Sequence, residues 1–586
     1  MYQLKWLWKN LKGYHVIYIT ALCLSVFGNV LQLTVPVFSQ KIVDLFLTGE
    51  NAAQNLATQK DLLMWLIMAM IGATVFRSLI SYCANMTYEH SSQKMIYSIR
   101  THMFRAMLNQ DMPFYDKFRT GDIMTRLTGD LDAIRHMASW IIRMIVECVT
   151  MILIGMGYFL YLDPLIALSL IVLGPVIFVL TLMFRKEIAP EHRELRECMA
   201  QLNTAAQENI SGNRVVKAFA REDYEITHFD EKNDAYRKKN IHTALVWLKY
   251  FPYIDTCANM LPVILLVVGG LSLISGRITM GEYVAFNGMT WTISNPMRRL
   301  GDIVNQYQRF QAAAKKVLEI YDSVPEVRDK QDAVSHPESF KGSIEFRNVS
   351  FSYGDTEVLH NISFSVKKGE TVAIMGETGS GKTTLINMIP RFYDATKGTV
   401  LVDGIDVRDL KLHELRKSIG MAAQDVLLFS DTIDGNIAYG DSEMPAEVVH
   451  SFARSAAASE FIEKMPDGYD TVIGERGVGI SGGQKQRISL ARALAIRPSI
   501  LILDDTTSAV DLETESYIQD SLKHLDFGCT KLIIAQRISS TKDADKIIIL
   551  ENGRISEMGT HKELLARRGY YYQVYMLQHG GEEING

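Results

Sequence analysis

The sequence predicts a multi-domain membrane protein: an all-α domain of six transmembrane helices with long cytoplasmic helical extensions, followed by an α/β domain with a phosphate-binding loop. Three observations predict this fold class. Long apolar runs fill the first half of the 586 residues. Lys and Arg gather in the connections on one side of those runs. After Pro325, strand-like and helix-like segments alternate, which is typical of an α/β domain.

Composition by itself excludes little, since 48% of the residues are hydrophobic and 22% are charged. The net charge of −5 is small, so we expect no nucleic-acid partner. The six cysteines show no CxxC pair and no metal-binding spacing. Four of them, Cys23, Cys83, Cys148 and Cys257, lie in or beside apolar runs, and we interpret the cysteines as small buried hydrophobes.

A transmembrane helix needs about 20 apolar residues. Six segments meet or approach this length, and the last of them continues as a helix toward Tyr321: 16–40, 62–88, 141–162, 164–184, 245–276 and 283–297. Residues 1–12 carry three Lys and two Trp, and we interpret them as a short amphipathic helix on the membrane surface.

Loop charge sets the orientation of these spans. Residues 89–136 contain seven Lys and Arg, and residues 185–243 contain eleven. The connections on the other side carry few basic residues: Lys41 and Lys60 in the first and Arg277 in the third. The positive-inside rule therefore predicts a multi-pass protein of the cell membrane, in contact with the lipid bilayer, with both termini, both long loops and the α/β domain in the cytoplasm. The long inner loops are rich in helix-forming residues, so the spans are expected to extend well into the cytoplasm.

The expected domain limits follow from the change in composition. Residues 1–325 form the transmembrane domain with two cytoplasmic loop regions, residues 326–342 a polar linker, and residues 343–586 the α/β domain.

A glycine-rich loop in the α/β domain predicts nucleotide binding. It follows the apolar strand 371–375, precedes a helical stretch, and comprises Gly376, Glu377, Thr378, Gly379, Ser380, Gly381, Lys382, Thr383 and Thr384. This is the strand–GxxxxGK[ST]–helix pattern of a P-loop, whose backbone N–H groups and helix N-terminus bind phosphates. Lys382 is expected to contact the β- and γ-phosphates of ATP, and the Thr383 hydroxyl to bind Mg²⁺. The apolar strand 501–504 ends in Asp504, which is expected to hold Mg²⁺ through water.

Further motifs resemble one family, the ATP-binding cassette (ABC) transporters, and among them the exporter-type half-transporters. Residues 480–484, with Ser481, Gly482, Gly483 and Gln484, resemble the LSGGQ signature with Ile in place of Leu. The other matches are Gln424 for the Q-loop, 508–511 with Asp511 for the D-loop, Tyr353 for the ring that stacks on adenine, 474–477 for the X-loop, and 113–122 and 210–219 for the two coupling regions.

The resemblance implies that two such chains place ATP between the P-loop of one and the signature of the other. Ser481, Gly482 and Gly483 would then contact the γ-phosphate held by the partner chain, and Gln424 would join Thr383 and Asp504 around Mg²⁺. The implied activity is ATP hydrolysis that drives transport of a small-molecule substrate.

Two positions depart from the family pattern. The family has Glu where this chain has Asp505, and His where it has Gln536. An Asp carboxylate falls about 1.5 Å short of the attacking water, and a misplacement of this size costs on the order of a hundredfold in rate. Gln can donate a hydrogen bond but cannot hold a proton as His does. Either hydrolysis survives these changes, or this site is slow. We favour a slow site, which resembles the degenerate subunit of a heterodimeric, multidrug-type exporter.

The substrate class stays open at the level of sequence. The charged residues in the spans are Arg77, Arg143, Glu147, Lys249, Asp255, Arg298, Arg299 and Asp302. They indicate either structural pairing near the inner interface or a polar cavity for amphipathic or charged substrates. The expected function is export of amphipathic or lipophilic molecules. The alternatives are an importer of the same fold and an ATP-binding regulatory membrane protein that does not pump.

Overall fold

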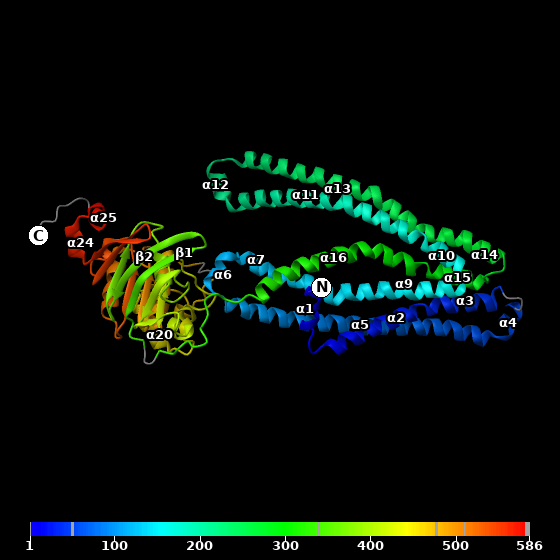
Figure 1. Ribbon diagram of the computed structural model, residues 1–586, viewed down its shortest axis with the longest axis horizontal. Coiled ribbons are helices and arrows are strands. Elements are labelled where there is room, and N and C mark those ends of the chain that lie inside the picture. The colour runs from blue at the N-terminus through cyan, green and yellow to red at the C-terminus, as the bar shows by residue number, and fades with distance from the viewer. Residues whose placement is uncertain (1, 49–51, 337–339, 475–478, 509, 580–586) are drawn as a thin grey trace. The chain divides into compact units, whose positions relative to one another are not determined.

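The computed structural model describes residues 2–48, 52–336, 340–474, 479–508 and 510–579 (Figure 1). Contacts between residues divide the chain into two compact units. The helical unit contains Met1–Leu108 and Thr120–Ser323, and the α/β unit contains Asn109–Arg119 and Val324–Gly586. The short segment 109–119 therefore belongs by its contacts to the α/β unit.

Long and short α-helices make up the helical unit. They are α1 (Tyr2–Asn10), α2 (His15–Gln32), α3 (Thr34–Phe46), α4 (Ala52–Thr58), α5 (Lys60–Leu108), α7 (Thr120–Thr125), α8 (Leu131–His136), α9 (Ile142–Leu162), α10 (Pro164–Ile171), α11 (Leu173–Ser211), α12 (Asn213–Ala218), α13 (Glu222–Ile264), α14 (Gly270–Ile274), α15 (Met280–Met289) and α16 (Trp291–Tyr321). Helix α5 alone has 49 residues, so it extends far beyond the roughly 20 that a bilayer requires. The predicted helical extensions are therefore present.

Within the part of the chain that the structure describes, four stretches are long and apolar enough to cross a membrane: His15–Phe46, Lys60–Leu108, Thr120–Leu162 and Glu222–Ile274. They coincide with four of the six expected spans, the last of which, 245–276, runs two residues past Ile274. The expected span 164–184 lies in α10 and α11, which adjoin at Val172, and the span 283–297 lies in α15 and α16, which adjoin at Thr290. The backbone at both joining residues is right-handed helical. Both α11 and α16 reach three charged residues within 18 residues of their starts, so the apolar run in each is short. For these two segments, membrane crossing stays a prediction.

Helix α1 packs against the helical unit through its apolar side. Trp6 and Leu7 are buried. The Trp6 ring meets the Tyr321 ring edge-on at 5.4 Å, and the Tyr321 hydroxyl donates to Oδ1 of Asn10 at 3.1 Å. The predicted helix is present, but much of its apolar surface contacts protein.

The cysteine prediction holds in part. Cys148 and Cys529 are buried, whereas Cys23 and Cys83 are exposed on the helical unit. Both exposed residues lie in stretches apolar enough to span a membrane, where an apolar side chain needs no protein partner.

The α/β unit contains two sheets. The strands are β1 (Ile344–Tyr353), β2 (Thr356–Val366), β3 (Thr371–Met375), β4 (Lys397–Val402), β5 (Ile405–Asp406), β6 (Ile419–Ala422), β7 (Ile500–Asp504), β8 (Thr530–Ile534), β9 (Lys546–Glu551) and β10 (Arg554–Gly559). Strands β2-β1-β4-β5 form an antiparallel sheet. The second sheet has the order β10-β9-β3-β8-β7-β6, and it is parallel from β9 to β6.

The second sheet is covered on both faces, as its continuous apolar strands predict. Ile502 and Ile534 belong to the apolar cluster shared with β1 and β2. Their neighbours Leu503 and Ile533 belong to a second cluster, shared with the helices. The helices of this unit are α6 (Met112–Lys117), α17 (Lys382–Asn387), α18 (Leu412–Lys417), α19 (Ile433–Ile437), α20 (Ala446–Ser455), α21 (Ser459–Glu463), α22 (Gly482–Ala495), α23 (Leu512–Lys523), α24 (His561–Arg567) and α25 (Tyr570–Gln578).

Strand register brings the predicted site residues to one edge of this sheet. Ile534 of β8 is paired with Ile374 of β3 on one side and with Asp504 of β7 on the other. The segments that follow these three strands therefore begin side by side, because parallel strands end at the same edge.

Candidate nucleotide site

The loop between β3 and α17 has the backbone of a phosphate-binding loop. Gly376, Gly379 and Gly381 have φ of 146°, 84° and 98°, which L side chains rarely adopt. A Cβ at Gly376 would lie 2.1 Å from the Leu550 carbonyl oxygen. The sequence pattern therefore corresponds to a turn that requires glycine at these positions.

Lys382 folds back over this loop. Its Nζ donates to the carbonyl oxygens of Gly376 at 2.9 Å and Glu377 at 2.6 Å. Burial lowers the pKa of Lys382, and the nearby carboxylates of Asp504 and Asp505 oppose this effect. The ammonium group is thus held at the loop, where a phosphate would offer it a stronger, charge-assisted hydrogen bond.

Thr383 and Asp504 are far apart in the sequence but lie in contact in the structure. The Thr383 hydroxyl donates to Oδ2 of Asp504 at 2.9 Å. Burial raises the pKa of Asp504, although its hydrogen bond from Thr383 acts in the opposite direction. A hydroxyl and a carboxylate at this distance are the oxygen ligands that Mg²⁺ prefers, so the residues present fit this ion.

Tyr353 lies beside the P-loop helix. Its hydroxyl is 3.5 Å from Oγ1 of Thr384. The Tyr353 ring packs edge-on against the rings of Phe351, at 4.7 Å, and Tyr393, at 5.3 Å. Its exposed fraction of 39% leaves ring surface available for a nucleotide base.

Asp505 has a left-handed backbone with φ of 50°, which Asp adopts more readily than most residues. Its carbonyl oxygen accepts hydrogen bonds from Gln486 Nε2 at 3.3 Å and from the Ser508 hydroxyl at 2.9 Å. Burial raises the pKa of the Asp505 carboxyl, and the charge of Arg537 opposes that shift. The backbone of Asp505 is therefore fixed by Gln486 of α22 and by Ser508, three residues further along the chain.

Gln424 and Gln536 both follow strands of this sheet, β6 and β8, and both are exposed. The Gln536 carbonyl oxygen accepts a hydrogen bond from Gln578 Nε2 at 2.8 Å. No hydrogen bond joins the Gln424 side chain to Thr383 or Asp504 in the described part of the chain, so the place of Gln424 among the Mg²⁺ ligands stays a prediction.

The signature residues form a helix N-terminus. Ser481 caps α22 with a capping box: its Oγ accepts from Gln484 N at 3.3 Å, and Gln484 Oε1 accepts from Ser481 N at 2.8 Å. Ser481 and Gly482 are exposed and Gly483 is half-buried. Asp511 caps α23 by accepting from Thr514 N at 2.9 Å. Most of the X-loop match, residues 475–477, and Ala509 of the D-loop match lie outside the described residues.

Three features of the site have no motif in the sequence. Arg537 donates to Glu515 at 3.2 Å and to the Ser508 carbonyl oxygen at 3.4 Å, which ties the Gln536 segment to the D-loop segment. Gln578 reaches Gln536 from the C-terminal helix. Tyr393 donates to Asp116 of α6 at 2.8 Å. Alternating strands and helices place such residues together only after folding, so no local signal announces them.

The two coupling-region matches differ in their contacts. Asp111 caps α6 and also accepts from Val327 N at 2.8 Å, so the first region is fixed to the α/β unit. The second region contains α12, at the tip of the hairpin formed by α11 and α13 (Figure 1). Ile210, Val215 and Phe219 there are 76%, 61% and 73% exposed.

A polar cavity of about 230 Å³ lies within the helical unit. It is lined by Ser25, Asn29, Gln32, Arg77, Ser81, Ala84, Asn85, Arg143, Glu147, Met151, Trp291, Asn295 and Arg299. Several of the charged residues expected in the spans therefore gather around one space.

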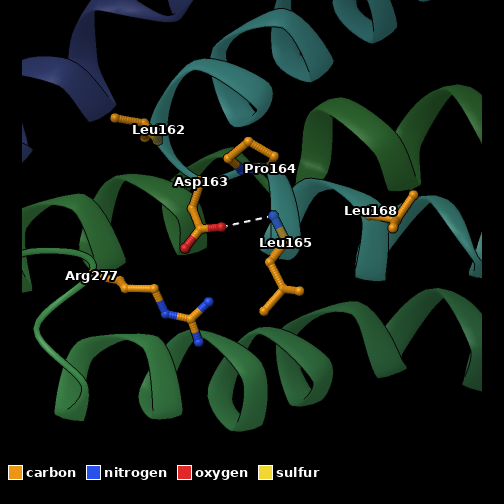
Figure 2. A pocket seen from close by; sticks show the side chains of 6 residues that line it. All are labelled: Leu162, Asp163, Pro164, Leu165, Leu168 and Arg277. Atoms are coloured by element: carbon orange, nitrogen blue, oxygen red, sulfur yellow. Dashed lines mark hydrogen bonds between the residues drawn. The ribbon is translucent and has the colours of Figure 1, made fainter.

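A second hollow, of about 580 Å³, lies where α9 meets α10 (Figure 2). Asp163 caps α10 there by accepting from Leu165 N at 2.7 Å, and Arg277 extends its guanidinium group alongside Leu165. Among the described residues, no group of three or more His, Cys, Asp or Glu side chains is arranged to hold a metal ion.

Comparison with known proteins agrees with this geometry. Residues 18–297 match the family model described as ABC transporter transmembrane region, and residues 359–508 match the model described as ABC transporter. An uncharacterized ABC transporter ATP-binding protein, YknU of Bacillus subtilis, is 35% identical over 97% of this chain and 96% of its own length. The putative multidrug export ATP-binding/permease protein YgaD of the same organism is 36% identical over 94% of each chain.

An ATP-dependent lipid A-core flippase of Syntrophus aciditrophicus is 35% identical over 89% of this chain and 87% of its own. The solved structure of a bacterial Atm1-family ABC exporter with ATP bound superposes with a TM-score of 0.82, at 27% identity, over 96% of this chain and 99% of the other. The matches cover both the helical membrane domain and the α/β ATPase domain. This chain belongs to the ABC transporter family, as an exporter-type half-transporter whose ATP-binding domain hydrolyses ATP to drive transport.

Proposed function

We propose that this exporter moves amphipathic molecules with an anionic head group out of the cytoplasm. The observation that carries this substrate class is the polar cavity of the helical unit. Arg77, Arg143 and Arg299 bring three guanidinium groups to it, and Glu147 is the one carboxylate among its described lining residues.

The positive charge of the cavity is not balanced by its own residues. Arg143 Nε lies 3.5 Å from Glu147 Oε1, which leaves Arg77 and Arg299 for other anions. Two other cations of the spans are paired: Arg298 with Asp255 at 2.8 Å and Lys249 with Glu187 at 2.9 Å. An unpaired charge inside a membrane costs about 2.5–3.5 kcal/mol on insertion scales, so an anionic ligand would stabilise this cavity.

The cavity also has neutral hydrogen-bonding groups from Ser25, Asn29 and Asn295. Its volume of about 230 Å³ suits a head group better than a whole lipid. An attached apolar tail would then lie among the surrounding apolar helices. The likeness to a lipid A-core flippase and to a putative multidrug exporter supports an amphipathic cargo.

We further propose that the working transporter is a heterodimer in which this chain holds the slow ATP site. Thr383 and Asp504 bind Mg²⁺, Gln536 donates its amide hydrogen to the γ-phosphate, and Asp505 positions water poorly because it is one methylene shorter than Glu. The exposed Ser481 and Gly482 are available to ATP on the partner chain. The exposed apolar tip of α12 also fits contact with a second chain.

The substrate class is tested by ATPase stimulation in proteoliposomes containing both half-transporters. Three amphiphiles of equal chain length are compared: an alkyl phosphate, an alkyl glucoside and an alkyl trimethylammonium. The alkyl phosphate should stimulate at the lowest concentration, and Arg77→Gln with Arg299→Gln should remove this preference. Arg298→Gln is the matched control, because Arg298 already has Asp255 as its partner.

Stimulation that favours the cation would overturn the anionic substrate class. Direction is measured separately, in inside-out membrane vesicles supplied with Mg²⁺ and ATP, which should accumulate the alkyl phosphate. ATP-dependent uptake from the extracellular face would instead establish import.

A further inference from the structure

The C-terminal helix α25 is anchored beside the nucleotide site. Tyr571 is fully buried in an apolar cluster that includes Met375, the last residue of the P-loop strand, and Ile538. The Tyr571 hydroxyl is also 2.6 Å from Nδ1 of His561. A helix fixed in this way can hold its neighbours in a defined position.

Gln578, at the end of this helix, binds the Gln536 segment on both sides of Arg537. Its Nε2 donates to the Gln536 carbonyl oxygen at 2.8 Å, and its Oε1 accepts from Ile538 N at 2.8 Å. The Gln578 side-chain amide therefore pairs with the carbonyl group of Gln536 and the N–H group of Ile538, as the backbone of a neighbouring strand would.

The same segment is held from the opposite direction by Arg537. Its guanidinium group binds Glu515 at 3.2 Å and the Ser508 carbonyl oxygen at 3.4 Å. Glu515 is buried, with an exposed fraction of 2%. The backbone at Gln536 is thus fixed between α25 and the D-loop segment, while the Gln536 side chain itself stays exposed.

We propose that Gln578 is a positioning residue for Gln536: its bidentate hydrogen bond holds the backbone so that the Gln536 amide meets the γ-phosphate. This inference rests on the phosphate contact proposed above for Gln536. A small displacement is sufficient to lose such a contact, because hydrogen bonds weaken steeply with distance and angle. The C-terminal helix then becomes part of the ATP site.

The test is equilibrium binding of a slowly hydrolysed ATP analogue, ATPγS, and of ADP, each with Mg²⁺, to the full chain. Only the analogue has a γ-phosphate, so the ratio of the two affinities measures the Gln536 contact. Gln578→Ala should lower this ratio about three- to tenfold, as expected for one hydrogen bond, and leave ADP affinity unchanged. Gln573→Ala, at an exposed position of the same helix, is the control and should change neither affinity.

A second variant separates positioning from loss of folding. Gln578→Glu keeps the acceptor for Ile538 N, but its carboxylate cannot donate to the Gln536 carbonyl oxygen. The carboxyl regains a donor when protonated, so the affinity ratio of this variant should recover as the pH falls toward its pKa, unlike that of the original chain. A ratio without this pH dependence would overturn the proposal.

The double variant Gln536→Ala with Gln578→Ala separates the positioning role of Gln578 from the phosphate contact of Gln536. Its affinity ratio should equal that of Gln536→Ala alone, because Gln578 acts only through Gln536. Additive losses would overturn the positioning role. If Gln578→Ala keeps a normal affinity ratio while Gln536→Ala lowers it, the positioning role of Gln578 is overturned and the phosphate contact of Gln536 still stands. If Gln536→Ala itself keeps a normal ratio, the phosphate contact of Gln536 is overturned.

Discussion

The hydroxyl of Tyr393 donates a hydrogen bond of 2.8 Å to Oδ2 of Asp116, which ties the aromatic residues beside the P-loop to α6. Tyr393 also packs edge-on against Tyr353, with ring centroids 5.3 Å apart. Burial and the hydrogen bond to Asp116 raise the pKa of the Tyr393 hydroxyl above its ordinary value. A nucleotide base stacked on Tyr353 would therefore be two contacts away from the first coupling region.

Tyr393→Phe removes this hydrogen bond and keeps the ring. We expect ATP hydrolysis to continue while the amount of substrate transported per ATP falls severalfold, because Asp116 in the first coupling region loses its hydrogen bond to Tyr393. Transport and phosphate release are measured together in proteoliposomes. Tyr517→Phe, at an exposed tyrosine of the same unit, serves as control, and an unchanged ratio in Tyr393→Phe would contradict the coupling role.

Lys382→Ala should weaken ATP binding at this chain's own site. The lost charge-assisted contact to phosphate is worth about 1.5–3 kcal/mol, or roughly a 10- to 150-fold change in dissociation constant. Nucleotide titration of the purified chain measures it. Lys367→Ala, in the turn before β3, provides the comparison, and equal affinity in both variants would remove Lys382 from the phosphate site.

The slow-site proposal predicts unequal effects of two substitutions in the heterodimer. Asp505→Asn should lower total ATPase activity only modestly, because turnover at that site is already slow. Ser481→Arg should nearly abolish activity, since it places bulk and charge where the partner's γ-phosphate lies. The reverse order of severity would contradict the proposal, as would robust ATPase activity of this chain alone as a homodimer.

A restoring variant tests the same proposal from the other side. Asp505→Glu together with Gln536→His should raise hydrolysis at this chain's site by about a hundredfold if carboxylate reach limits the rate. Hydrolysis is measured with the partner's own site inactivated. No increase would show that these two positions do not limit turnover.

We expect the α/β unit to become less stable in acid, because the pKa of Asp403 is lowered in the folded state. Burial alone would raise its pKa, but hydrogen bonds from the backbone N–H groups of Ser343, Lys341 and Gly342 outweigh burial and lower it. A lowered pKa in the folded state means that the carboxylate stabilises the fold above its unfolded pKa of about 3.9, and that this contribution is lost as the pH falls through the folded value.

Asp403→Asn should therefore be less stable than the original chain at pH 7, and the difference should shrink as the pH falls below about 4. The substitution is tolerated by the backbone, because Asp403 has φ of 52° and Asn adopts this conformation readily. Thermal unfolding across pH measures the difference. A constant gap between the two proteins down to low pH would contradict the prediction.

Local patterns predicted the parts of the site that are built locally. The P-loop glycines are recognisable because their φ values exclude most other residues, and Asp504 because it ends an apolar strand. The meeting of Tyr393 with Asp116 was not predictable, since these common residue types are 277 positions apart and only folding joins them. Gln578 was missed for the same reason.

The assignment of residues 109–119 to the α/β unit has a consequence for biosynthesis. The ribosome adds Asp116 of this segment 277 residues before it adds Tyr393. Synthesis proceeds at about 5–20 residues per second, so the surface that α6 binds is made on the order of tens of seconds after α6 itself. Docking of this helix is therefore a late step in maturation, and substitutions at Asp111 or Asp116 should appear first as a lower yield of mature protein, through quality control of chains whose α6 remains undocked.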